Sequence, residues 1–321
     1  MATRITVLGL GKTGISVGLA LEDSKKSVIR VGFDEDKELK NLAKKKKAFD
    51  ELPGKIAEAI KDADIVVLDI PVNKLRTVFL AIASSLKPNS IVVNMSPMVK
   101  ASDQWALELL PENVYFISAI PAFSYKSLDD VNKEPGSARA DLFEKSMMFI
   151  AGDAKLRKEV IDVVVDFAVL LGATPYFTDL DEVEGLIANV ILLPELAAAA
   201  LANSTMLQPG WDDNQRLAGN IYHLALKPLE LVNETEDYGI SILQNKQNIL
   251  PILEKYISAM QQIQQMIVDD DHEGLADLLR DILLTRQEWL NKRKQGKWNQ
   301  YLTSSIPLKQ DAIRRFSNHS S

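Results

Sequence analysis

The sequence predicts an α/β protein in two parts, a doubly wound parallel sheet followed by an all-helical domain. Three observations support this class. Short β-rich runs alternate with amphipathic segments in the first half, an apolar period of 3.6 residues replaces them in the second half, and a glycine-rich turn follows the first β-rich run. With 321 residues, the chain is also long enough for two hydrophobic cores.

Seven strands are expected in the first half, each a short run rich in aliphatic or aromatic residues. They cover residues 5–8, 28–33, 65–68, 91–94, 115–119, 147–151 and 175–178. Helical patterns separate most of them, at residues 14–21, 55–61, 75–86, 102–109 and 155–171. Strands that alternate with helices are typical of a parallel sheet with a helical layer on its faces.

The second half lacks strand signals, and we place the domains at residues 1–178 and 179–321. Long helical patterns follow the boundary, at residues 180–207, 213–235, 240–268 and 272–294. They contain more leucine and isoleucine than one small bundle needs, so we expect a homodimer formed through the helical domain. The polar tail from Thr303 is expected to be loosely held.

The composition narrows the possible partners. A chain with 46% apolar and 25% charged residues is typical of a globular protein. Its net charge of −7 and pI of about 5.2 give no positive field, so nucleic acid is not expected as a partner. The sequence has no cysteine and three scattered histidines, so we expect no metal site.

A cytoplasmic location without membrane contact is also expected. The N-terminus enters a strand at once and lacks the regions of a signal peptide. The most apolar run, residues 190–201, is too short to cross a bilayer and contains Pro194 and Glu195. It is therefore interpreted as a buried helix.

The glycine-rich turn is a G-x-G-x-x-G motif between a strand and a helix, which is the fingerprint of a Rossmann-type dinucleotide site. Gly9 allows the tight turn, Gly11 lets the backbone approach the pyrophosphate, and Gly14 lets the helix pack on the sheet. The free amides at the helix N-terminus would receive the phosphates. The whole motif is a candidate cofactor site: Gly9, Leu10, Gly11, Lys12, Thr13 and Gly14.

The second strand ends at Asp34, twenty residues after the last glycine, where a carboxylate accepts hydrogen bonds from ribose hydroxyls. This favours NAD, because the same charge would repel the extra phosphate of NADP. NADP stays possible, since Arg30 and Lys37 are near in sequence. The alternative is a Rossmann-like domain that binds another adenine nucleotide or none.

Several segments along the chain resemble the prephenate and arogenate dehydrogenase family. They are Ile5 to Gly11, Asp69-Ile70-Pro71-Val72, Asn94-Met95-Ser96 with Lys100, Ala140 to Glu144, Leu193-Pro194 and Asn214 to Ala218. The resemblance implies an NAD(P)-dependent oxidoreductase that removes a hydride from a carboxylate-bearing cyclohexadienol, as in tyrosine biosynthesis. It also implies that Pro71 lies beside the nicotinamide. Asn94 is a further candidate cofactor contact, because it follows the fourth strand at the ligand-binding edge of the sheet.

The sequence differs from the family at the position of the catalytic base. The family uses a histidine as the general base, and this position is Ile120 here. Other family histidines align with Val183, Leu192 and Glu195. Three readings stay open: another substrate or base, a catalytically silent nucleotide-binding sensor, or a dehydrogenase of the β-hydroxyacid or opine type.

Four residues are candidates for catalysis. By resemblance, Arg216 binds a substrate carboxylate, and His223 would share its helix face and replace the missing base. Asn220 and Lys227 would complete this stripe, which a solvated helix face explains equally well. Glu195 is either a buried carboxylate with a raised pKa or a partner contact, and Ser96 follows a strand at the ligand-binding edge of the sheet. The set is therefore Ser96, Glu195, Arg216 and His223.

Overall fold

The computed structural model describes residues 2–24, 27–128, 134–153, 156–231, 235–296 and 309–318. The chain forms two compact units, one of residues 1–183 with 287–321 and one of residues 184–286. The first crossing lies near the predicted boundary at 178/179. The chain crosses back into the first unit at residue 287. The prediction of one helical domain over residues 179–321 did not include this second crossing.

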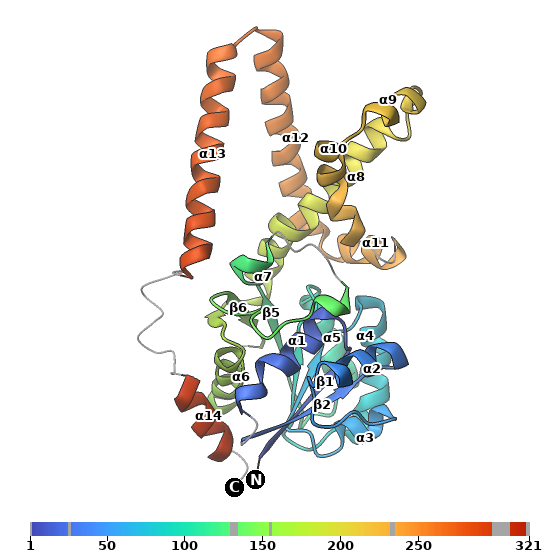
Figure 1. Ribbon diagram of the computed structural model, residues 1–321, viewed down its shortest axis with the longest axis vertical. Helices are drawn as coiled ribbons and strands as arrows, with labels where there is room; N and C mark the ends of the chain where they lie inside the picture. Colours follow the sequence, from blue (N-terminus) through green and yellow to red (C-terminus); the bar gives the residue numbers. More distant parts are fainter. Residues whose placement is uncertain are drawn as a thin grey trace. The chain divides into compact units, whose positions relative to one another are not determined.

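The first unit contains one sheet of seven strands in the order β2-β1-β3-β4-β5-β6-β7. Figure 1 labels β1, β2, β5 and β6 of this sheet. The strands are β1 Thr3–Leu8, β2 Val28–Phe33, β3 Ile65–Leu68, β4 Ile91–Asn94, β5 Tyr115–Pro121, β6 Met147–Ala151 and β7 Thr174–Phe177. All seven predicted strands are confirmed, with ends that differ by at most two residues.

The sequence predicts a wholly parallel sheet, and this prediction is wrong for one pair of strands. β6 runs antiparallel to β5, with Ile120 opposite Phe149. The described parts of the connection between them hold only two short 3₁₀ turns, η3 (Tyr125–Ser127) and η4 (Pro135–Ser137). A parallel pair needs a crossover long enough to return the chain to the starting edge, and these turns do not provide one.

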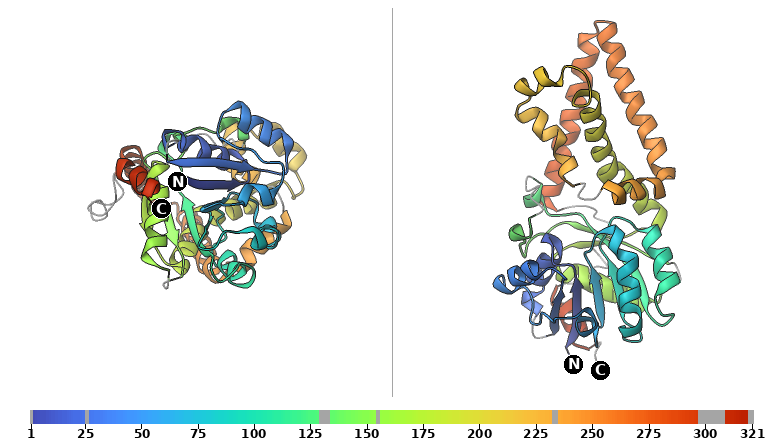
Figure 2. Two further views of the ribbon diagram at one scale, coloured as in Figure 1. Left: turned by 90° about the horizontal axis from the view of Figure 1, so that it is seen from below. Right: turned by 90° about the vertical axis from the view of Figure 1, so that its right-hand side faces the viewer.

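Helices cover both faces of the sheet (Figure 2). The helical elements up to β7 are α1 Lys12–Ala20, η1 Glu22–Ser24, α2 Lys37–Lys45, α3 Ile56–Ile60, α4 Val72–Ile82, η2 Ala83–Ser85, α5 Lys100–Leu109 and α6 Lys158–Leu170. One core cluster joins the sheet to α1 and α6, and a second joins it to α3, α4 and α5. Neighbouring residues of one strand enter opposite clusters, as Val66 and Val67 do. The strands are therefore buried on both faces, which explains their continuous apolar runs.

The C-terminal segment is more ordered than its polar composition predicted. Residues Lys309–Asn318 form α14, which contacts α6 in the first unit. Ala312 is fully buried in the core cluster of α1 and α6. Arg315 lies 3.6 Å from the buried carboxylate of Asp166 on α6. The expectation of a loose tail is therefore wrong for this helix.

The remaining elements are helical. They are α7 Leu180–Ile187, the π-turn η5 Ala188–Leu192, α8 Leu193–Thr205, α9 Trp211–Leu217, α10 Asn220–Leu226, η6 Lys227–Leu231, α11 Thr235–Gln244, α12 Lys246–Val268 and α13 His272–Gln295. The π-turn directly precedes Pro194, which lacks an amide hydrogen and whose ring crowds the carbonyl four residues earlier. Widening the helix there relieves that clash.

The predicted single helix over 213–235 is wrong. α9 ends at Leu217 and α10 begins at Asn220, because Ala218 and Gly219 have extended backbones with ψ of 107° and −153°. Glycine is a poor helix former and favours such a break. Arg216, Asn220, His223 and Lys227 therefore do not share the single helix face on which their spacing placed them.

The helix predicted over residues 180–207 is confirmed as residues 180–205, with the π-turn inside it. The expectation that its apolar run, residues 190–201, is buried is wrong in part, since Val190 is 70% exposed. The most apolar window of this helix has a mean hydropathy of 1.9, which with the length of the helix suffices to span a membrane, and 28% of this window is buried. Large apolar side chains are also exposed on α12 and α13, including Ile257, Met260 and Leu283. The second unit thus presents apolar surface that its own fold does not cover.

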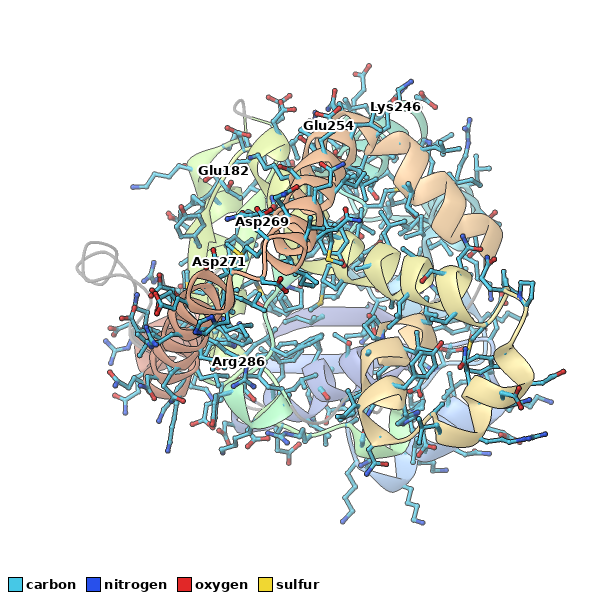
Figure 3. The ribbon with its side chains drawn as sticks, turned by 90° about the horizontal axis from the view of Figure 1, so that it is seen from above. Glu182, Lys246, Glu254, Asp269, Asp271 and Arg286 are labelled. Carbon is cyan, nitrogen blue, oxygen red and sulfur yellow. The ribbon has the colours of Figure 1, made fainter. Side chains whose placement is uncertain are left out.

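The turn between α12 and α13 carries a concentration of acidic side chains (Figure 3). Asp271 accepts a hydrogen bond from the Gly274 amide at 2.9 Å, and Gln265 donates one to Asp269 at 2.9 Å. These bonds order the end of one helix and the start of the next. Among the described residues, no group of three or more His, Asp and Glu side chains is placed to hold a metal ion.

Candidate functional site

The sheet changes winding direction between β1 and β3. From β1 the chain passes to β2 on one side, and β3 then pairs with β1 on the other side. Ligands of open α/β sheets bind at such a switch point, beside the carboxyl ends of the strands. The glycine loop follows β1 at this point, and Asp69 follows β3.

Two glycines of the loop are required by the fold itself. Gly9 has a φ of +94°, and a Cβ there would lie 1.9 Å from the Asp69 carbonyl oxygen. A Cβ on Gly14 would lie 1.9 Å from the Gly9 carbonyl oxygen. Any larger residue would therefore separate α1 from the sheet or distort the turn.

Gly11 has a different environment. A Cβ at this position would meet an Asp69 carboxylate oxygen at 3.6 Å, which is ordinary van der Waals contact. The fold therefore tolerates a side chain at Gly11, and the requirement for glycine comes from a ligand that approaches the backbone. Gly11 is also the N-cap of α1 and has no side chain to cap it, so the first amides of α1 face this space.

Asp34 connects the end of β2 to the glycine loop. One carboxylate oxygen accepts a hydrogen bond from the Leu10 amide at 2.7 Å, and the other accepts one from the Asp36 amide at 2.8 Å. Both bonds hold the carboxylate beside the loop while leaving it partly exposed. This is the place at which a Rossmann carboxylate meets a ribose.

Asp69 is a second carboxylate at the loop and is not among the site residues predicted from the sequence. Its Oδ2 accepts a hydrogen bond from the Gly14 amide at 2.7 Å. Burial raises the pKa of Asp69 to about 6, the bond from Gly14 opposes that rise, and the charge of Asp34 adds to it. The available signal was an acidic residue at the end of an otherwise apolar strand.

Asn94 and Ser96 lie at the end of β4 and are buried. The Asn94 side-chain amide donates to the Ser96 carbonyl at 3.2 Å and to the Ser118 hydroxyl at 3.3 Å. The Ser96 amide donates to Asn94 Oδ1 at 3.0 Å. These side chains therefore hold the turn after β4 and the neighbouring strand together. Pro71, in contrast, is exposed at the N-cap of α4.

The position of the family's general base lies within the sheet. Ile120 is on β5 and is 7% exposed. Its aliphatic side chain has no group that transfers a proton. The structure thus leaves the departure noted in the sequence unchanged.

The other candidate catalytic residues belong to the second unit. Arg216 on α9 pairs with Asp213 at 3.2 Å, and its side chain is 78% exposed. His223 on α10 is exposed, whereas Glu195 on α8 is buried. Glu184, which the sequence did not point to, is also buried. The glycine loop, Asp34 and Asp69 thus form one cluster in the first unit, which none of these second-unit residues belongs to.

Comparison with known families decides the relationship. Residues 17–176 match the nucleotide-binding domain of prephenate dehydrogenase, and residues 181–281 match its dimerization domain. The chain belongs to the prephenate dehydrogenase family. The first match begins just after the glycine loop, so the loop geometry is independent support for a nucleotide site.

Similar proteins and structures extend over most of the chain. Cyclohexadienyl dehydrogenase of Zymomonas mobilis is 21% identical over 280 residues, which are 86% of this chain and 92% of that protein. Prephenate dehydrogenase of Bacillus subtilis is 22% identical, covering 86% of this chain and 73% of that protein. The fold matches prephenate dehydrogenase of Aquifex aeolicus, solved with hydroxyphenyl propionate and NAD+, with a TM-score of 0.71 and 17% identity over 90% of this chain and 98% of that one.

Arogenate dehydrogenase of Synechocystis has the same fold, with a TM-score of 0.68 and 18% identity. The superposition includes 89% of this chain and 100% of the Synechocystis chain. Both family domains and their order are therefore present here.

Proposed function

We propose that this protein is an NAD-dependent dehydrogenase that oxidises a carboxylate-bearing cyclohexadienol, the reaction type of tyrosine biosynthesis. The observation that carries the proposal is the family match over residues 17–176 and 181–281, joined to a glycine loop whose open side is at Gly11. The related A. aeolicus enzyme was solved with NAD+ and an aromatic carboxylic acid. This supports both the cofactor and the substrate class.

The cofactor site would use groups from three segments. The amides at the start of α1 would bind the pyrophosphate, and Asp34 would accept hydrogen bonds from the ribose hydroxyls. NAD, when bound, accepts the hydride. Lys12 and Thr13 lie in the loop at the pyrophosphate, and exposed Pro71 would border the nicotinamide. The charge of Asp34 favours NAD over NADP.

The substrate carboxylate would bind Arg216, whose guanidinium offers two parallel hydrogen bonds. Arg216 pairs with exposed Asp213, and an exposed ion pair of this kind exchanges readily for a ligand. Ile120 cannot accept the ring hydroxyl proton. We assign that role to His223 or Glu195. Ser96 and Asn94 would border the nucleotide site at the end of β4.

An absorbance assay for reduced nicotinamide tests this proposal. Prephenate and arogenate are each offered to the purified protein with NAD and with NADP. We expect turnover with NAD, a loss of at least about a hundredfold in kcat when the base is removed, and little change for the other candidate. His223→Ala and Glu195→Gln distinguish the two. Absence of turnover with both substrates would contradict the proposed reaction.

A second function is favoured by one observation, the aliphatic residue at position 120. A catalytically silent nucleotide-binding sensor would need no base there. It would bind NAD without turnover of either substrate, so calorimetric binding with NAD beside the absorbance assay separates it from the enzyme.

We also propose a cytoplasmic homodimer formed through the helical domain. The match of residues 181–281 to a dimerization domain supports this assembly. A partner subunit would cover the exposed apolar side chains of the second unit and would account for the apolar helix 180–205 without a membrane.

A further inference from the structure

The carboxylate of Asp69 lies where the cofactor's phosphates are expected. Its Oδ2 accepts the bond from the Gly14 amide and is also the nearest atom to the open side of Gly11, 3.6 Å from the Cβ position. The backbone approach that Gly11 permits is the approach of the pyrophosphate. An ionised Asp69 would therefore face a doubly charged pyrophosphate across this space.

The surroundings of Asp69 make the interaction between its ionised carboxylate and the pyrophosphate unfavourable. Asp34, from the end of β2, adds a second negative charge, and burial already disfavours the ionised form of Asp69. Lys12, in the first turn of α1, is the cation of the same loop, and the end of β4 contributes the neutral Asn94 and Ser96. Asp34 and Asp69 thus bring two carboxylates to the glycine loop, in which Lys12 supplies a positive charge.

We propose that Asp69 binds the dinucleotide in its protonated form, donating a hydrogen bond to a pyrophosphate oxygen, so that cofactor binding takes up one proton. When the proton is on Oδ2, that oxygen donates through its hydrogen and still accepts through a remaining lone pair. Asp69 can therefore keep its bond from the Gly14 amide while it turns from a repelling group into a donor. The proton comes from solvent, and the bond to Gly14 is not broken.

The direction of the pH dependence follows from the free protein. With a pKa of about 6, Asp69 is largely protonated at pH 5.5 and largely ionised at pH 7.5. The phosphates stabilise the protonated form further, so binding takes up a proton above pH 6. NAD affinity should weaken as the pH rises, approaching a tenfold loss for each pH unit, which is the limit for one proton.

Isothermal titration of the full-length protein with NAD tests the inference. At pH 5.5, 6.5 and 7.5, each in two buffers of different ionisation enthalpy, the wild type should take up close to one proton at the highest pH. Asp69→Asn keeps the acceptor for Gly14 and removes the titration. It should bind NAD about thirtyfold more tightly than the wild type at pH 7.5, since this pH is about 1.5 units above the pKa of Asp69, and show no proton uptake.

Glu35→Gln is the matched control, because Glu35 is an exposed neighbour of Asp34 and its loss changes the net charge equally. It should keep the wild-type proton uptake. ADP-ribose, which has the pyrophosphate and no nicotinamide, should show the same uptake as NAD. Thermal unfolding checks that Asp69→Asn is folded, and Asp69→Ser provides a second variant without the charge.

The inference rests on the nucleotide site of the proposed function. Different experimental results would contradict the inference and the proposed function. Binding of NAD without proton uptake in the wild type, or uptake that persists in both Asp69 variants, would overturn the inference alone. Proton uptake with NAD and none with ADP-ribose would also overturn it. Absence of NAD binding at every pH in all variants would overturn both.

Discussion

Single residues of the glycine loop meet separate physical demands. Gly9 and Gly14 are fixed by backbone contacts that would place a Cβ 1.9 Å from a carbonyl oxygen, whereas Gly11 has room for a Cβ. Asp34 and Asp69 hold the two ends of the loop through the Leu10 and Gly14 amides. Stability and ligand binding can therefore be altered separately at this site.

Gly11→Ala should weaken NAD binding while leaving the fold intact. The added Cβ meets only an ordinary contact at 3.6 Å, but it occupies the approach of the pyrophosphate. We expect at least about a tenfold rise in the Kd for NAD and a melting temperature close to that of the wild type. Gly14→Ala is the contrasting variant and should lose about 3 kcal/mol or more of stability. Unchanged NAD affinity in Gly11→Ala would argue against the site.

Asp34→Ser should shift the cofactor preference toward NADP. The substitution removes the charge that repels a 2′-phosphate and the acceptor for the ribose hydroxyls and the Leu10 amide. Loss of a charged hydrogen bond of about 1.5–3 kcal/mol corresponds to a roughly tenfold or greater rise in the Kd for NAD. The ratio of the NAD and NADP constants is the measurement. An unaltered ratio would mean that another residue selects the cofactor.

Whole elements differ from their sequence patterns where tertiary contacts intervene. The stripe of Arg216 and His223 required one continuous helix, and the extended backbone at Ala218 and Gly219 divides it. The helix α14 shows the opposite case. Its sequence is mostly polar, yet the small side chain of Ala312 allows it to pack closely on α6.

Ala312→Glu should detach α14 from α6. A carboxylate placed in the fully buried position of Ala312 would lose its hydration without gaining a partner. A loss of about 2 kcal/mol would lower the melting temperature by roughly 4–8 °C for a unit of this size. Gln310→Glu adds the same charge on the exposed side of α14 and should change the melting temperature little. Equal effects of the two variants would show that the docking does not stabilise the protein.

At the scale of the whole molecule, the two units differ in how much apolar surface a single chain leaves exposed. In the first unit the apolar side chains fill two clusters on the faces of the sheet. In the second unit, Ile257 on α12 is 52% exposed and Leu217 on α9 is 91% exposed. Such a surface is expected of a domain whose core is completed by a second copy.

Ile257→Glu should weaken the proposed dimer. A charge buried against a partner subunit without a counter-ion is costly, so sedimentation equilibrium should show a dimer for the wild type and a larger monomer fraction for the variant. Leu80→Glu is the control, because Leu80 is an equally exposed apolar residue on α4 in the first unit. It should leave the association unchanged. A monomeric wild type would contradict the proposed assembly.

The sequence by itself determined the two-part class, the seven strands, the long helices around residues 180–205 and 246–295, and the glycine loop with Asp34. These features depend on local periodicity and on backbone rules that act over a few residues. The missing histidine at Ile120 was also visible, because it is a property of one position.

Only the tertiary structure decided which distant residues meet. In the structure, β6 pairs antiparallel to β5, and the helix ends before Ala218. α14 packs on α6, and Asp69 bonds to the Gly14 amide across 55 residues of sequence. Local patterns carry no information on such contacts, since the burial and charge of Asp69 arise from segments that the fold brings together. For that reason the sequence pattern does not predict Asp69 as a site residue.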